Sequence, residues 1–122
     1  MGEEVSWRVK NNNKFLKVDF SNVKSDVAAV LVAKNAFNSC IPCENKTVRA
    51  LVVVNGGQIT PMAMREIMEM GKNVQDKLKK SAIVGVVGML SLLFRIYMSY
   101  TGSKLRFFTD ESAALEYILS DN

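Results

Sequence analysis

The order of hydrophobic and polar residues predicts a hairpin at the start of the chain, followed by a helix. Hydrophobic and polar residues alternate over Val5–Val9 and again over Lys14–Phe20, and the three asparagines between them suit a tight turn. The next segment, Val27–Phe37, places its larger hydrophobic residues, Val27 and Leu31 among them, on one helical face. We therefore expect two antiparallel strands and then a helix that buries this face.

Helices and strands alternate along the rest of the chain. Thr47–Val54 ends in a continuous apolar run, which is typical of a strand covered on both faces. Thr60 and Pro61 predict a helix that reaches Lys77, with the threonine as N-cap and the proline at the first position. The remaining predicted elements are a buried strand over Ser81–Val87, a helix from Gly88 to Gly102, a short strand over Leu105–Phe108 and a final helix capped by Thr109-Asp110.

This order predicts an α/β fold. Alternating units of this length give a mostly parallel central sheet with right-handed crossovers, and the opening hairpin adds an antiparallel edge. No linker or repeat interrupts the 122 residues, so we expect one domain over residues 1–122 with helices packed on the sheet.

The composition argues against catalysis. Histidine is absent, which removes the commonest general base, the commonest zinc ligand and every Ser-His or Cys-His nucleophile. No pair of acidic residues stands out for acid–base work either. We expect a protein that is not an enzyme and that needs no metal and no cofactor.

The charge is mildly basic and unevenly spread. Sixteen Lys and Arg against twelve Asp and Glu give a net charge of +4, with a basic excess from Lys72 to Arg106 but no basic tract. We therefore expect no nucleic-acid binding. The opening residues show no signal peptide, and the longest uncharged run, Ser81–Phe94, is too short for a helix that crosses a hydrocarbon layer of about 30 Å. These features predict a cytoplasmic protein without a membrane span.

Three segments of the C-terminal half carry a resemblance to a known family. They are Lys80–Gly88 (KSAIVGVVG), Tyr97–Gly102 (YMSYTG) and Phe108–Ala114 (FTDESAA). With the opening WRVKNNNKFLKVDFSNV they resemble the small bacterial SpoIIAA-like proteins of the STAS group. The resemblance implies a compact α/β domain without catalytic activity. It also implies a regulatory module that binds a protein partner, since the better-studied relatives bind a kinase-like protein.

In those relatives a serine at the entry to the second helix is phosphorylated, within an Asp-Ser-Ser-Gly-like motif. The matching place here is Asn55–Pro61, where the motif is missing and Thr60 is the one hydroxyl residue. Thr60 is therefore either a helix cap alone or also a phosphorylation switch.

The two cysteines, Cys40 and Cys43, flank an Ile-Pro dipeptide. A redox centre needs the first cysteine at a helix N-terminus, where the helix dipole lowers its pKa. Here the predicted helix precedes the pair, and its C-terminal end raises the pKa instead. We expect reduced structural thiols, with a redox role as the alternative, and Pro42 as the residue that ends the helix.

Gly85 and Gly88 stand where a parallel strand passes into a helix. Close packing of strand and helix explains both glycines. The alternative is an anion or headgroup held by backbone amides at the helix N-terminus, with help from Lys80, Lys104 or Arg106.

Two further groups of apolar residues suggest binding surfaces. Met64 and Met68 have the spacing of core residues on one helix, while Met62 and Met70 lie elsewhere on it; a Met-rich groove for a partner and a soft-metal site are the alternatives. The helix from Met89 to Tyr100 is apolar nearly all round. An exposed side of that helix would contact a partner, a second copy or a lipid-like ligand.

Two hypotheses follow. The first is a non-catalytic module that binds a protein partner, alone or as a homodimer. The second is a carrier or sensor that binds a small anionic or lipid-like ligand between the Met89 helix and the sheet. The residues that we expect to contact a partner or a ligand under these two hypotheses are Gly56, Gly57, Thr60, Gly85, Gly88, Met89, Leu92, Tyr97, Lys80, Lys104 and Arg106.

Overall fold

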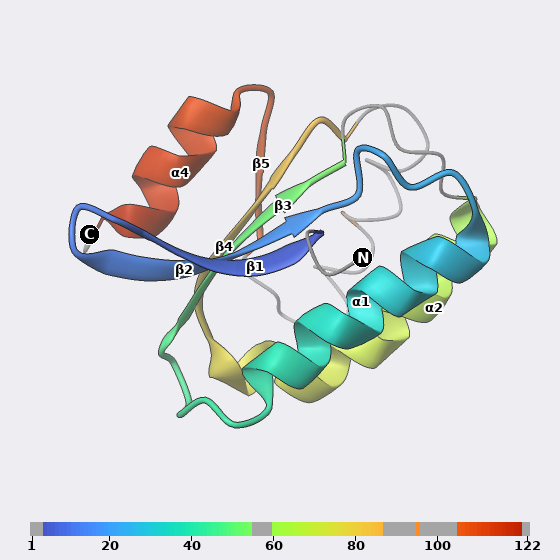
Figure 1. The fold of residues 1–122 in the computed structure, drawn as a ribbon, viewed down its shortest axis with the longest axis horizontal. Coiled ribbons are helices and arrows are strands. Elements are labelled where there is room, and N and C mark those ends of the chain that lie inside the picture. Colours follow the sequence, from blue (N-terminus) through green and yellow to red (C-terminus); the bar gives the residue numbers. More distant parts are fainter. Residues whose placement is uncertain (1–3, 55–59, 87–94, 96–104, 121–122) are drawn as a thin grey trace.

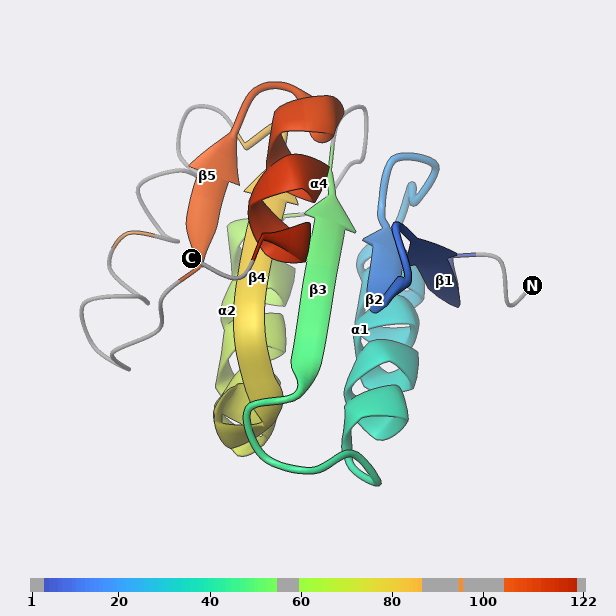
Figure 2. The same cartoon turned by 90° about the vertical axis from the view of Figure 1, so that its left-hand side faces the viewer.

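The computed structural model describes residues 4–54, 60–86, 95 and 105–120, which form one mixed sheet with helices on both faces. Five strands lie in the order β1-β2-β3-β4-β5; α1 and α2 cover one face, and α4 covers the other (Figures 1 and 2). The elements are β1 (Val5–Lys10), β2 (Asn13–Asp19), α1 (Asp26–Cys40), β3 (Val48–Val53), α2 (Pro61–Gly71), the 3-10 helix η1 (Lys72–Lys77), β4 (Leu78–Val84), β5 (Arg106–Phe108) and α4 (Glu111–Leu119). The predicted α/β fold is confirmed.

The opening hairpin and the parallel strands follow the predicted topology. β1 pairs antiparallel with β2, and the β2–β3, β3–β4 and β4–β5 pairs are all parallel. Asn11 and Asn12 make the turn with φ of 54° and 66°. Asparagine tolerates this left-handed region, which a two-residue hairpin turn requires. The predicted helix from Gly88 to Gly102 lies outside the described residues.

Successive side chains along the central strands point alternately into two cores, one on each face of the sheet. Leu16 and Ile83 face α1 and α2, whereas Phe15, Leu51 and Ala82 face α4. This alternation is the period-two rule of a pleated strand, and it explains why the central strands read as continuous apolar runs. No helix in the described part of the chain is long and apolar enough to cross a membrane.

All three described α-helices begin at a side-chain cap. Ser25, Thr60 and Asp110 each accept a hydrogen bond from the backbone N–H three residues later, at 3.1–3.2 Å. Such caps satisfy N–H groups that lack a partner in the first helical turn. The structure confirms the predicted capping by Thr60 and Asp110.

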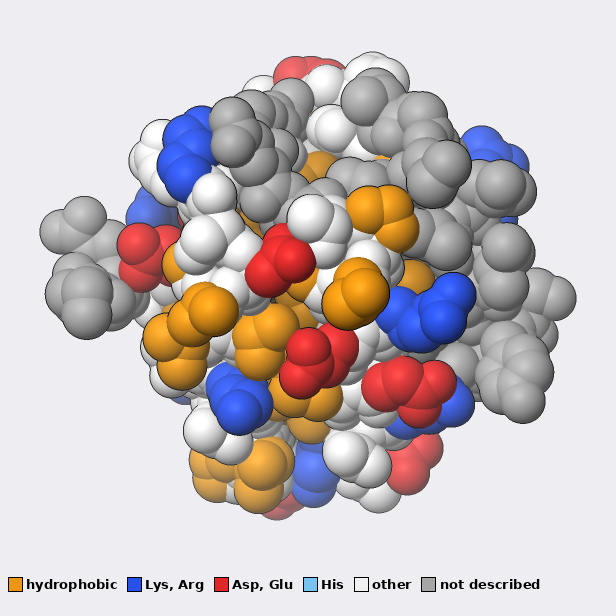
Figure 3. All heavy atoms as spheres, turned by 90° about the vertical axis from the view of Figure 1, so that its right-hand side faces the viewer, with side chains coloured by type: hydrophobic (Ala, Val, Ile, Leu, Met, Phe, Trp, Pro, Cys, Tyr) orange, Lys and Arg blue, Asp and Glu red, His pale blue; other side chains and the backbone are white. Residues whose placement is uncertain are grey.

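The buried face of α1 differs from the prediction. Val27 and Leu31 are 73% and 56% exposed. The face of the molecule drawn in Figure 3 mixes hydrophobic and charged side chains. The helix instead buries mostly small residues, namely Ala29, Val32, Ala33, Ala36 and Cys40. Small side chains let α1 lie close to the sheet and to α2. The closeness of this packing, rather than the size of the individual hydrophobic side chains, therefore determines which face of α1 is buried.

Two boundaries also differ from the prediction. The helix that begins at Pro61 stays α-helical only to Gly71 and then tightens into η1, which buries Val74. β4 covers Leu78–Val84 rather than Ser81–Val87, since it pairs with β3 from its first residue. Gly85 ends this strand with a φ of 90°, a conformation that strongly favours glycine.

Candidate functional site

An apolar cavity of about 140 Å³ lies between the sheet and the α1–α2 pair. The strands supply its floor, and the inward faces of α1, α2 and η1 supply its walls. Its lining consists of Leu16, Val18, Phe20, Ala33, Ala36, Phe37, Cys40, Ala50, Val52, Val54, Met64, Ile67, Met68, Gly71, Val74, Gln75, Leu78, Ser81, Ile83 and Leu105.

The described lining carries no Asp, Glu, Lys or Arg. Its polar side chains are Gln75, Ser81 and the thiol of Cys40. Gln75 donates from Nε2 to the carbonyl oxygen of Gly71 at 3.5 Å. A charged ligand buried there would lose its hydration without an opposite charge in return, which is strongly unfavourable. The cavity is therefore suited to an uncharged, apolar guest.

The methionines of α2 lie mostly on the inward side. Met64 is buried and Met68 is half-buried, and both line the cavity, as their spacing predicted. Met70 also packs partly against the core, contrary to its predicted place, whereas Met62 is 80% exposed. Flexible thioether side chains allow a wall to adapt to the shape of a guest.

The two thiols lie where α1 ends. Cys40 is the last residue of α1 and is buried, while Cys43 is half-buried and donates from Sγ to the carbonyl oxygen of Ser39 at 3.6 Å. Both thiols are free. Burial, and secondarily the neighbouring Cys43, raise the pKa of the Cys40 thiol from 9.0 to about 11. The predicted direction of the pKa shift is thus confirmed, and its main cause is burial. A neutral thiol is a poor nucleophile, which argues against the redox alternative.

This shift predicts a loss of stability in alkali. Between about pH 9 and pH 11 the Cys40 thiol ionises in the unfolded chain but stays protonated in the fold. The wild-type free energy of unfolding should fall over this range by on the order of 2 kcal/mol more than that of Cys40→Ala. Urea denaturation of both proteins at stepped pH measures the difference. Parallel pH profiles would contradict a buried, neutral thiol.

Most of the residues predicted for the working surface lie outside the described residues. They are Gly56, Gly57, Gly88, Met89, Leu92, Tyr97 and Lys104. Gly85 follows the carboxyl end of β4, and Thr60 caps the N-terminus of α2. Gly85 is explained there by its positive φ, and its N–H donates to the carbonyl oxygen of Phe108 at 3.1 Å.

Thr60 joins the N-termini of α1 and α2. Its hydroxyl donates to Oδ2 of Asp26 at 2.6 Å, and its N–H donates to Oδ1 of the same carboxylate at 3.2 Å. The hydroxyl oxygen also accepts the capping hydrogen bond from the N–H of Ala63. Thr60 therefore has a structural role at both helices that wall the cavity.

Replacing Thr60 with valine should lower the free energy of unfolding by about 1–2 kcal/mol, because valine keeps the shape but removes the cap and the contact with Asp26. Urea denaturation measures this change. Thr109→Val, at an exposed threonine that caps no helix, is the matched control and should change stability by less than about 0.5 kcal/mol. Equal losses in the two variants would contradict the role of Thr60.

Lys80 and Arg106, two of the cations predicted for an anion site, lie against Tyr117 on the α4 face. The Lys80 Nζ and the Arg106 Cζ are each 4.9 Å from the centre of the Tyr117 ring, on the α4 face. Lys80 also donates to the carbonyl oxygens of Tyr117 and Ser120 at 3.3 and 2.7 Å. The physical reason is that α4 ends here, and the carbonyl groups at a helix C-terminus attract cations.

Arg49 belongs to the same cluster and was not singled out from the sequence. It is buried in β3 and donates from Nη1 to the carbonyl oxygens of Ile118 and Ser120. The sequence did contain a signal for this role, because Arg49 is a charged residue within a segment whose apolar run predicts a fully buried strand. Arg49 and Lys80 thus bind the C-terminal end of α4 to the sheet.

A second hollow, of about 270 Å³, lies beside β5 and includes Arg106 together with Arg95, which was not predicted for the site. It is lined by Arg95, Leu105, Arg106 and Phe107, and the Arg95 Cζ lies 5.6 Å from the centre of the Phe107 ring. The guanidinium groups of Arg95 and Arg106 thus each lie against an aromatic ring.

Comparison with solved structures identifies the fold. The chain is similar to an uncharacterized protein of the DUF3478 family from Shewanella loihica PV-4, whose crystal structure has a SpoIIAA-like fold. The TM-score is 0.69 at 14% sequence identity, and the match covers 93% of this chain and 91% of that one. No protein-family model and no curated protein matches the sequence. The match confirms the SpoIIAA-like fold that the resemblance implied.

Proposed function

We propose that this chain is a non-catalytic binding module that holds a small, uncharged, apolar ligand between the sheet and the α1–α2 pair. The observation that carries the proposal is the cavity of about 140 Å³ whose described lining has no Asp, Glu, Lys or Arg. In another protein, an apolar cavity of about 150 Å³ binds benzene or xenon. A single ring or a short branched chain is therefore the expected size of ligand.

The lining also sets the polarity of the ligand. Gln75, Ser81 and Cys40 are its polar side chains, and Cys40 is neutral at physiological pH because its pKa is raised to about 11. A ligand with an apolar body and one uncharged polar group fits these residues. A headgroup with a full negative charge would have to lie outside the cavity. In this cavity an apolar ligand is thus favoured over an anionic one, while the ligand site predicted beside the Met89 helix lies outside the described residues.

A regulatory role of the STAS type is the second candidate, and the Thr60–Asp26 contact favours it. A phosphate on Thr60 would place negative charge next to the Asp26 carboxylate, now 2.6 Å from the threonine hydroxyl. That repulsion would separate the N-termini of the two helices that wall the cavity. Thr60→Glu tests this role: it should bind the apolar ligand more weakly than Thr60→Val, and equal affinities would argue against a switch.

Toluene and benzoate test the proposed function, since they have nearly the same shape but differ in charge. Toluene should raise the midpoint of thermal unfolding. At a hundredfold excess over Kd, its binding adds about 2.7 kcal/mol to the free energy of unfolding. Benzoate should leave the midpoint unchanged. Differential scanning calorimetry of the full chain measures both. Equal effects of the two compounds, or no effect of either, would contradict the proposal.

A further inference from the structure

The outer edge of β1 is a free sheet edge within the described part of the chain. β1 is the terminal strand in the order β1-β2-β3-β4-β5, and its one ladder is the antiparallel ladder with β2 (Figure 2). It is six residues long, twice the length of β5 at the opposite edge. Such an edge presents a row of backbone N–H and C=O groups that another extended chain can pair with.

The side chains along this edge differ between the two faces of the sheet. Arg8 is in register with Phe15, which packs toward α4, so Arg8 and Lys10 share the α4 face. Trp7 is in register with Leu16, which packs toward α1, so Trp7 and Val9 share the opposite face. Both cations are exposed, and Val9 is 70% exposed. Within β1, the two cations thus lie on one face of the strand, and Trp7 and Val9 lie on the other.

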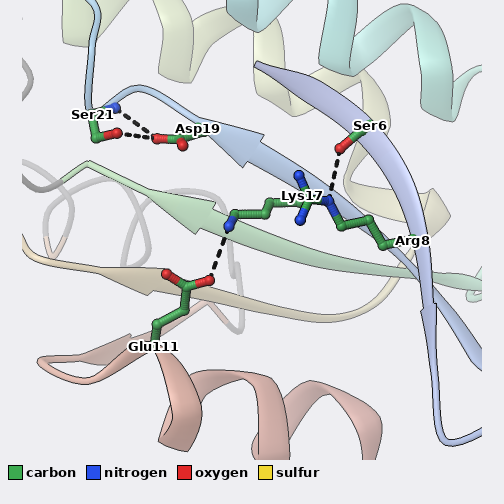
Figure 4. A network of polar contacts seen from close by, with 6 residues as sticks. All are labelled: Ser6, Arg8, Lys17, Asp19, Ser21 and Glu111. Carbon is green, nitrogen blue, oxygen red and sulfur yellow. Dashed lines mark hydrogen bonds and ion pairs between the residues drawn. The ribbon is translucent and has the colours of Figure 1, made fainter. Parts of the chain in front are cut away.

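The cations on this edge have no carboxylate partner among the described residues. Arg8 donates from Nε to Oγ of Ser6 at 3.1 Å and forms no ion pair with a carboxylate of the described segments (Figure 4). In contrast, Lys17 on the neighbouring strand forms an ion pair with Glu111 at 3.0 Å (Figure 4). Lys14 lies over Trp7, with its Nζ 4.4 Å from the ring centre, and adds a further positive charge to the hairpin.

These charges indicate whether β1 pairs with a second copy of itself or with a chain of opposite charge. If two copies of β1 paired antiparallel, the Arg8 and Lys10 side chains of both copies would lie on the same face, where like charges across a strand pair are destabilising. An acidic segment would meet the same cations with opposite charges, which stabilises the pair. The cations therefore disfavour a homodimer through β1 and favour a negatively charged partner.

We propose that the outer edge of β1 binds an extended acidic segment of another protein by strand addition. Backbone hydrogen bonds to β1 would supply the pairing, as in other cases of strand addition. Acidic side chains at alternate positions face Arg8 and Lys10, and apolar side chains between them face Val9 and Trp7. This partner site lies apart from the cavity and does not depend on it.

Three short peptides test the proposal on the full chain. TEVEVET has the alternating acidic and apolar pattern, TKVKVKT has the opposite charge, and TEPEPET keeps the acidic charge but cannot pair as a strand. Fluorescence anisotropy measures affinity, and the amide chemical shifts of β1 locate the binding. TEVEVET should bind about tenfold tighter than TKVKVKT or TEPEPET, with shifts centred on β1.

A charge reversal supplies the control. The double variant Arg8→Glu/Lys10→Glu should prefer TKVKVKT, while Lys34→Glu/Arg65→Glu, at exposed positions of α1 and α2, should keep the wild-type preference. Reversal in the first variant alone supports the site. The proposal is overturned if TEPEPET binds as well as TEVEVET, if both variants lose the preference, or if sedimentation shows wild-type dimers that Arg8→Glu/Lys10→Glu disrupts.

Discussion

Replacing Ala36 with leucine is expected to abolish the binding of toluene while the protein stays folded. Ala36 is buried on the inward face of α1 and lines the cavity of about 140 Å³. Leucine adds an isopropyl group at that point, which fills space that the ligand would occupy. We expect toluene affinity to fall by about a hundredfold or more, which corresponds to roughly 2.7 kcal/mol of lost binding free energy. Isothermal titration calorimetry measures the affinity.

Two further variants show whether volume is the cause. Asn38→Leu adds a leucine at an exposed position of α1 outside the lining and should bind toluene like the wild type. Ile67→Ala enlarges the cavity; it should lower stability by about 2–4 kcal/mol yet keep toluene binding. If Ala36→Leu unfolds, Ala50→Val fills the cavity from the sheet side. Unchanged toluene affinity in every folded filling variant would exclude the cavity as the ligand site.

Replacing Arg49 with methionine should cause the largest loss of stability away from the cavity. Arg49 is buried and donates to the carbonyl oxygens of Ile118 and Ser120 at the end of α4. Methionine fills similar space but leaves the buried carbonyl oxygen of Ile118 without the Arg49 donor, at about 1–3 kcal/mol, while the carbonyl oxygen of Ser120 keeps its hydrogen bond from Lys80. We expect the free energy of unfolding to fall by about 2 kcal/mol in urea denaturation.

Arg65→Met is the matched control for this prediction. Arg65 is exposed on α2, so the same change there should alter stability by less than about 0.5 kcal/mol. Hydrogen exchange adds a local measurement, because Arg49→Met should lower amide protection in α4 before it lowers protection in β3. Equal stability of the two variants, with α4 still protected, would show that Arg49 does not hold α4 to the sheet.

Local sequence chemistry was enough to predict the caps, the turn and the parallel order. Asn11 and Asn12 tolerate positive φ, and the side chains of Thr60 and Asp110 satisfy the first amides of their helices. These choices depend on residues within a few positions of each other. The apolar run that ends at Val54 also predicted a central strand correctly, because burial on both faces leaves few polar positions.

Packing between distant segments could not be predicted in the same way. The face of α1 that contains Val27 and Leu31 is more hydrophobic by residue type, yet the alanine face is buried because it fits against α2 and the sheet. The cavity is the space left after every wall is packed, so no local pattern shows it. The place of Lys80 likewise depends on where α4 ends, which is known only once the fold is known.

Methyl NMR with toluene reports both whether this ligand binds and which side chains it contacts. We expect saturable shifts of the methyl groups of Val52, Ile67 and Ile83, which line the cavity, and none for the exposed Val27 and Leu31. Benzoate at the same concentration should shift neither group. Toluene shifts at the exposed methyl groups alone, or none at the cavity methyl groups at saturating concentration, would contradict the claim that this fold holds an apolar ligand.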